Sequence, residues 1–159
     1  MVMAIPTPAN SNKPEADETG GESRMSAVLA RAEAAVADLA KDYATWALGD
    51  LAKARTALTA ATDDPTQRVR HVEALFRVAH DLKGQGASFG FPLVTKIGQS
   101  LCVLTRDRAR DHQPRHLDLA KSHLDAIELV LTKSIKGEGG KVGAELVAKL
   151  ELRVKDLLG

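Results

Sequence analysis

The sequence predicts an all-α fold, and two observations support this expectation. Apolar residues recur at three- and four-residue steps through most of the chain after residue 22, as in amphipathic helices, whereas nothing alternates with period two over a useful length. Only 3% of the 159 residues are aromatic, and alanine and leucine, both good helix formers, are abundant. We therefore expect an antiparallel four-helix-type bundle with an additional N-terminal helix and short loops.

The chain divides into a tail, residues 1–21, and a helical domain, residues 22–159. Three of the six prolines lie in the first segment together with a Gly-Gly pair. Such a segment buries too little apolar surface to offset its ordering entropy, so we expect a disordered tail.

The first helical region extends from Ser23 to about residue 61. Its apolar stripe consists of Leu29, Ala32, Val36, Leu39, Tyr43, Trp46, Leu51, Ala54 and Leu58. No proline interrupts the region, which is compatible with one long helix. Gly49 followed by Asp50, a candidate N-cap, favours a break into two helices near that point.

Four further helices follow. Asp64 as N-cap and Pro65 in the first turn open a helix that carries His80 and ends before Gly90. The remaining helices are expected over about 92–108, over about 114–135 and over 144–158.

Composition and charge exclude several classes of function. The formal net charge is +1, so there is no basic field for nucleic acid and no polybasic patch for a membrane surface. The single cysteine, Cys102, excludes an internal disulfide and fits a reducing compartment. Neither a signal peptide nor an apolar stretch of about 18 residues is found. We expect a cytoplasmic monomer.

Residues 79–90, "AHDLKGQGASFG", place a histidine, a lysine and three glycines in a helical context. On a helical wheel the apolar residues share one side, and His80 lies about 150° from their centre, so it should face solvent. The same exposed face should carry Phe76 and Arg77 before His80, and Lys83, Gly84 and Ala87 after it.

This group of side chains suits phosphoryl chemistry. Imidazole titrates just below neutral pH, so its neutral form is available as a nucleophile. A phosphoryl group attached to His80 would bring roughly two negative charges, which Lys83 one turn away would offset in part. Glycine costs a helix interior about 1 kcal/mol relative to alanine, and Gly84 keeps the approach to the imidazole open to something large, such as a partner's active site.

The segment resembles the signature of the histidine phosphotransfer (HPt) domains of two-component phosphorelays. That motif, His-x-Leu-Lys-Gly followed after five residues by Gly, is matched by His80, Leu82, Lys83, Gly84 and Gly90. The apolar and glycine rhythm of the next helix is matched by Leu93, Ile97, Gly98 and Leu101. The resemblance implies that His80 is the phosphoryl acceptor and donor, Lys83 its charge partner and Gly84 the clearance position.

Further site residues are expected around this motif. Partner docking is assigned to Phe76, Arg77, Ala87 and Gln99. The sequence departs from the family at Gln85, where many members have a small residue. It also departs at Cys102, where some members have a glutamine that hydrogen-bonds the imidazole, and Gln99 is the candidate replacement.

By this resemblance the protein is a relay between the receiver domain of a hybrid histidine kinase and that of a response regulator. It would need no cofactor of its own, with Mg²⁺ held by the partner receiver, and it has no ATP-binding motif. One alternative is a helical adaptor that docks on receivers or kinases without being phosphorylated. Another is a dimerising, kinase-like phosphotransfer protein without its ATPase half, against which the short bundle argues.

A metal site is the remaining alternative, because His112, His116 and His123 lie close together in the sequence. Metal sites in bundles need several convergent ligands, typically from paired Glu-x-x-His elements, and no such element occurs. We therefore expect no metal.

Overall fold

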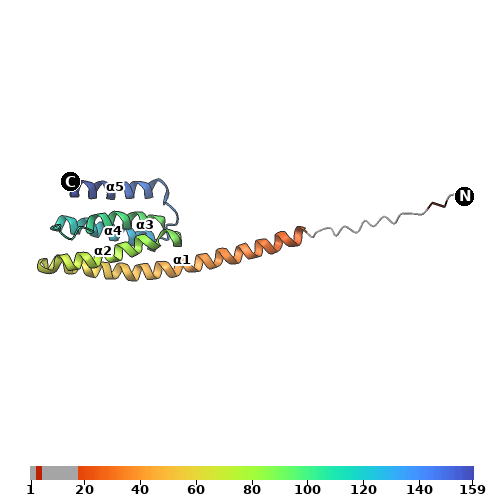
Figure 1. Ribbon diagram of the computed structural model, residues 1–159, viewed down its shortest axis with the longest axis horizontal. Coiled ribbons are helices and arrows are strands. Elements are labelled where there is room, and N and C mark those ends of the chain that lie inside the picture. The colour runs from red at the N-terminus through yellow and green to blue at the C-terminus, as the bar shows by residue number, and fades with distance from the viewer. Residues whose placement is uncertain (1–2, 5–17) are drawn as a thin grey trace. The chain divides into compact units, whose positions relative to one another are not determined.

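The computed structural model describes residues 3–4 and 18–159, and within them every regular element is a helix (Figure 1). The helices are α1 (Glu18–Asp63), α2 (Arg68–Gln85), α3 (Pro92–Thr105), α4 (Pro114–Thr132) and α5 (Gly140–Leu158). Short 3₁₀ turns at Pro65–Gln67 and Ala87–Phe89 flank α2. The all-α expectation is confirmed. No helix in the described ranges is long and apolar enough to cross a membrane.

The structure divides into two compact units, Met1–Ala35 and Val36–Gly159. The first contains the start of α1, which begins at Glu18, so the last residues of the expected tail are helical. Apart from Met3 and Ala4, which are exposed, the remainder of that tail lies outside the described residues. The second unit is the helical bundle.

Within the bundle, ion pairs, ring stacking and helix packing connect the helices. Arg55 of α1 pairs with Asp125 and Glu128 of α4, at 2.8 and 2.6 Å. Tyr43 of α1 stacks on Phe89, after α2, with 4.8 Å between ring centroids. Helix α3 packs against α2, α4 and α5, while α5 also touches α4. The bundle therefore consists of α1 to α4, with α5 added against α3 and α4.

The core is continuous across all five helices. Its largest fully buried side chains are Tyr43, Leu51, Leu75, Leu82, Phe91, Leu93, Ile97, Leu101, Leu104, Leu124, Ile127 and His123. The predicted stripe on α1 is buried only in its second half, where the buried side chains begin at Ala40. Leu29, Val36, Leu39 and Trp46 remain exposed. Periodicity reports an apolar face, but it does not report where another helix covers that face.

The expected break at Gly49 is wrong, because α1 is continuous from Glu18 to Asp63. Ala47 and Leu51, on either side of the glycine, are both buried in the core. Their packing stabilises the helix through Gly49. Asp50 pairs with Lys53 within the helix, at 3.1 Å, and caps nothing. The N-terminal addition is thus the first part of α1, not a separate helix.

Other helix ends agree with the sequence to within a few residues. Asp64 is an N-cap as predicted, but of the turn before α2, where its Oδ1 accepts hydrogen bonds from the backbone N–H groups of Thr66 and Gln67. Helix α3 ends at Thr105, earlier than expected, and α5 begins at Gly140, earlier than expected. Pro92 and Pro114 begin their helices as predicted.

Candidate functional site

His80 lies on the outer side of α2, and its side chain is 65% exposed. The Phe76 ring, one turn earlier, lies 6.1 Å from the imidazole between centroids. Asp81 Oδ1 lies 4.0 Å from His80 Nδ1, which is too far for a hydrogen bond. The exposed position predicted from the helical wheel is confirmed, so a partner can reach the ring without unfolding the helix.

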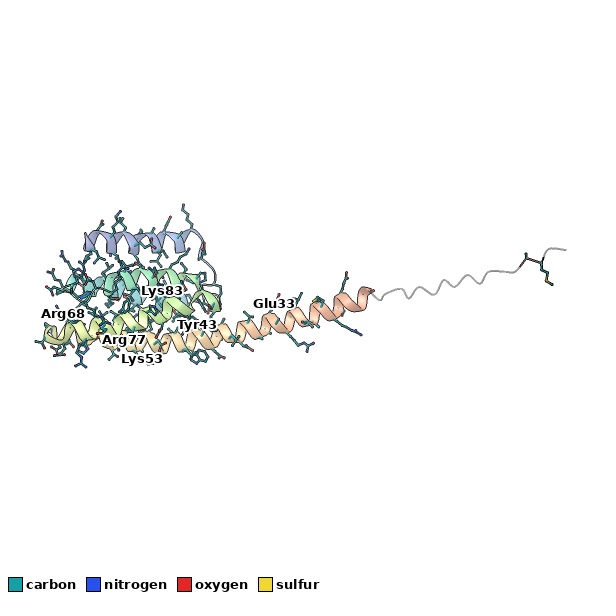
Figure 2. All side chains as sticks on the ribbon, viewed as in Figure 1. Glu33, Tyr43, Lys53, Arg68, Arg77 and Lys83 are labelled. Atoms are coloured by element: carbon teal, nitrogen blue, oxygen red, sulfur yellow. The ribbon has the colours of Figure 1, made fainter. Side chains whose placement is uncertain are left out.

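Lys83 is half-buried at a close contact between α2 and α3. A Cβ atom at Gly98 of α3 would lie only 3.1 Å from the Lys83 backbone nitrogen. Among the described residues, the Lys83 ammonium group is paired with no carboxylate. Figure 2 shows Lys83 and Arg77 along α2, with Lys53 and Tyr43 on α1. Lys83 is therefore a cation whose charge is available on the surface beside His80.

The three glycines of this segment serve three different purposes. A Cβ atom at Gly84 would meet nothing within 4 Å, so the residue faces open space as predicted. At Gly86 the same atom would lie 2.9 Å from the Phe91 carbonyl oxygen, so only glycine lets α2 end against the next segment. Gly90 has φ +87°, a left-handed conformation that glycine adopts without strain.

The expected docking residues occupy different settings. Arg77 is exposed, and its guanidinium donates to Glu73. Phe76 is half-buried against the core. Gln99 is exposed on α3, and within the described chain neither it nor Cys102 hydrogen-bonds the His80 ring. Ala87 is exposed, but it lies in the turn after α2 and not two turns along the same helix. The wheel fails there because α2 ends at Gln85.

Cys102 lies inside the bundle, close to the charge of Lys83. Burial raises the pKa of the thiol, while the positive charge of Lys83 acts in the opposite direction. The buried thiol is held in its neutral form, which fits a packing residue better than a nucleophile.

Two site residues were missed by the sequence reasoning. Glu73 Oε1 accepts a hydrogen bond from Arg77 Nη2 at 2.7 Å and forms an ion pair with Arg108 Nη2 at 3.1 Å. The pair with Arg77 has the i, i+4 spacing that could have revealed it. Arg108 follows α3, and no sequence signal places it against α2.

The histidines considered for a metal site are core residues. The buried imidazole of His123 donates from Nδ1 to the Leu119 carbonyl oxygen at 2.7 Å, and its Nε2 accepts from the Ser100 hydroxyl at 2.9 Å. His116 Nδ1 accepts the backbone N–H of Gln113 at the start of α4. Within the described ranges, no group of three or more His, Cys, Asp and Glu side chains is arranged to hold a metal ion. The absence of metal binding remains a prediction.

Comparison with known proteins adds an independent observation. The family model of the Hpt domain matches residues 38–130, which span more than half of the chain and include His80, Lys83 and Gly84. No curated protein and no solved structure matches the chain. Hpt domains take part in phosphotransfer in two-component phosphorelays and interact with receiver domains of kinases and response regulators. With a helical bundle and this match over most of it, the chain belongs to the Hpt domain family and takes part in two-component phosphotransfer.

Proposed function

We propose that His80 accepts a phosphoryl group from the aspartate of one receiver domain and passes it to the aspartate of another. One observation supports this above all. In this Hpt domain, the imidazole that matches the family motif is exposed on α2, and a Cβ atom at Gly84 would meet open space. One turn along, Lys83 pairs with no carboxylate of the described residues. The donor is the receiver of a hybrid histidine kinase and the acceptor that of a response regulator.

The chemistry needs only a neutral imidazole and a correctly placed partner. An unprotonated ring nitrogen of His80 attacks the phosphorus of the aspartyl phosphate. The new P–N bond forms as the P–O bond to the aspartate breaks, and that side chain leaves as a carboxylate. The negative charge of Asp81, on the Nδ1 side of the ring, favours a proton on Nδ1 and leaves Nε2 as the nucleophile.

The receiver supplies what this chain does not. Phosphoryl transfer depends mainly on positioning and on electrostatic stabilisation, and the receiver's acidic cluster holds the Mg²⁺ in this proposal. The Hpt chain contributes the nucleophile, the charge of Lys83 and a docking surface that includes Phe76, Arg77, Ala87 and Gln99. The same arrangement serves both directions of transfer, because the aspartyl phosphate and the phosphohistidine exchange roles.

The test is to mix the protein with a phosphorylated receiver and to locate the label. We expect His80→Gln to abolish labelling while folding and receiver binding remain, since the exposed imidazole contributes little packing. His71→Gln is the matched control, because His71 lies on the same helix and is the next candidate nucleophile. Labelling of the His80→Gln variant at the wild-type rate would place the nucleophile elsewhere.

The stability of the label identifies its chemistry. A phosphoramidate on His80 is lost in acid, because protonation of the ring nitrogen makes it a good leaving group, and it survives in alkali. An aspartyl phosphate is lost in alkali, and a phosphoserine at Ser88 survives acid. An alkali-stable, acid-labile label that needs His80 supports the relay. Receiver binding without any label would instead support the adaptor.

A further inference from the structure

Glu73 joins two arginines beside the proposed phosphorylation site. Its Oε1 atom lies 2.7 Å from Arg77 Nη2 and 3.1 Å from Arg108 Nη2. The Glu73 side chain is only 23% exposed, whereas those of Arg77 and Arg108 are 73% and 69% exposed. One carboxylate oxygen thus serves two guanidinium groups, and the three charges sum to a net positive charge on the outer side of α2.

Arg77 and Lys83 flank His80 symmetrically along the helix. Arg77 is three residues before the imidazole and Lys83 three residues after it, so both positions neighbour His80 on the helix surface. The two cations differ in their partners. Lys83 pairs with no carboxylate of the described residues, whereas Arg77 is engaged by Glu73. Lys83 is available at all times, and Arg77 only when it leaves Glu73.

We propose that Arg77 is a second cation for the phosphorylated form of His80, held by Glu73 until the phosphoryl group arrives. This proposal rests on the proposed function of His80. On phosphorylation, the guanidinium of Arg77 moves from the Glu73 carboxylate to the phosphoryl oxygens. Arg108 stays on Glu73, so the half-buried carboxylate keeps a partner throughout the exchange.

Charge and geometry favour this exchange. An i, i+4 ion pair whose guanidinium is largely exposed, as in Glu73–Arg77, is weak, so the guanidinium leaves at little cost. A phosphoryl group brings about two negative charges against one on the carboxylate. Its oxygens also match the planar, two-pronged donor of arginine, which lysine cannot imitate. Arg108 lowers the cost further, because Glu73 is not left unpaired.

The test measures the pKa of the phosphoryl group on His80 by phosphorus NMR. Phosphoramidate, a small-molecule phosphoryl donor, loads the protein without any receiver. A nearby cation lowers the phosphoryl pKa, so we expect Arg77→Gln to raise it by about 0.3 to 0.7 units, the size of an exposed ion pair. Arg108→Gln should raise it by a smaller amount, because Glu73 then holds Arg77 alone.

Glu73→Gln should lower the phosphoryl pKa, because it releases Arg77. In the absence of Arg77, Glu73→Gln should have no effect, so the Glu73→Gln/Arg77→Gln double variant should have the same phosphoryl pKa as Arg77→Gln. This comparison separates the release of Arg77 from the loss of the negative charge of Glu73. Arg77→Lys should recover part of the wild-type value. Arg70→Gln, an exposed arginine of α2 more than two turns from His80, is the matched control and should change little.

Two results would overturn the proposal. One is an Arg77→Gln shift no larger than that of Arg70→Gln, and the other is a Glu73→Gln effect that persists without Arg77. Asp81 also lies near His80, but it is the same in every variant and cannot produce these differences. A failure here, with labelling by the receiver intact, leaves the proposed function standing. A receiver that transfers nothing to His80 rejects the function itself.

Discussion

At the scale of the residue, Gly84 and Lys83 are two features of the α2 surface that folding alone does not explain. Gly84 lacks a side chain where a helix would benefit from having one, and Lys83 carries a charge that no carboxylate of the described residues pairs with. Both features cost stability or contribute nothing to it in the free protein. Both become useful when a large, negatively charged partner approaches His80.

Lys83→Ala should slow phosphoryl transfer or shorten the lifetime of the phosphorylated protein. Its charge acts only when the phosphoryl group is present, so the melting temperature should change little. Transfer from a labelled receiver and the decay of the isolated phosphoprotein measure these effects, with Lys149→Ala on the exposed side of α5 as control. Equal rates and lifetimes in Lys83→Ala and wild type would remove Lys83 from the mechanism.

Gly84→Gln should block transfer while raising the free energy of unfolding by about 0.5 to 1 kcal/mol, because glutamine is the better helix former. The side chain has room, since a Cβ atom there meets nothing within 4 Å. Gly49→Gln is the matched control, because Gly49 is also a helical glycine that faces open space. It should gain similar stability and keep transfer. A stabilised Gly84→Gln protein that transfers at full speed would contradict the clearance role.

At the scale of the element, the contact between α2 and α3 positions the site. Gly98 of α3 lets the Lys83 backbone approach so closely that an added Cβ atom would lie 3.1 Å from its nitrogen and 3.2 Å from its Cα. The obstacle is helix backbone, which cannot rotate away as a flexible side chain can. The glycine in the motif of the second helix is therefore a packing requirement that bears directly on the site.

Gly98→Ala should lower the free energy of unfolding by about 1 to 3 kcal/mol, because overpacking forces the two helices apart. Because the Lys83 backbone moves with α2, transfer should also slow. Urea denaturation and transfer assays measure the two effects, and Gly49→Ala provides a control in which the added methyl group meets no neighbour. An unchanged or increased urea midpoint for Gly98→Ala would show that the helices can adjust without loss.

At the scale of the whole molecule, three buried histidines join α4 and the segment before it to the bundle. Burial lowers the pKa of His123, His112 and His116, and for the last two neighbouring positive charge acts in the same direction. At His112, burial outweighs nearby backbone groups and a carboxylate, which act in the opposite direction. In addition, neither ring nitrogen of His112, nor Nε2 of His116, has a hydrogen-bond partner among the described residues. The native bundle therefore favours the neutral form of all three.

This predicts a loss of stability in mild acid. When the pKa of a histidine is lower in the folded than in the unfolded chain, the unfolded chain binds more protons in mild acid. The free energy of unfolding is therefore highest above about pH 6.5 and decreases as the pH falls below that value. Each histidine contributes a slope of at most about 1.4 kcal/mol per pH unit. Urea denaturation between pH 7.5 and 5 measures it. His123→Gln should make the slope shallower, by at most about 1.4 kcal/mol per pH unit, and a flat wild-type profile would contradict the prediction.

The sequence by itself determined the all-α class, the helix starts at Pro92 and Pro114, and the exposed position of His80. These depend on local rules, namely periodicity, proline at the first turn of a helix, and the angular spacing of residues on a wheel. The open space at Gly84 was also predicted, because it follows from the position of one residue on one helix.

Only the tertiary structure decided the rest. Whether the apolar stripe of α1 is covered, and whether Gly49 breaks that helix, depend on which other helices pack against it. The place of Ala87 depends on where α2 ends, which the close approach of Gly86 to Phe91 helps to fix. The contact of Arg108 with Glu73 joins residues from different elements. Such contacts depend on how the helices pack, and helical periodicity describes one helix at a time.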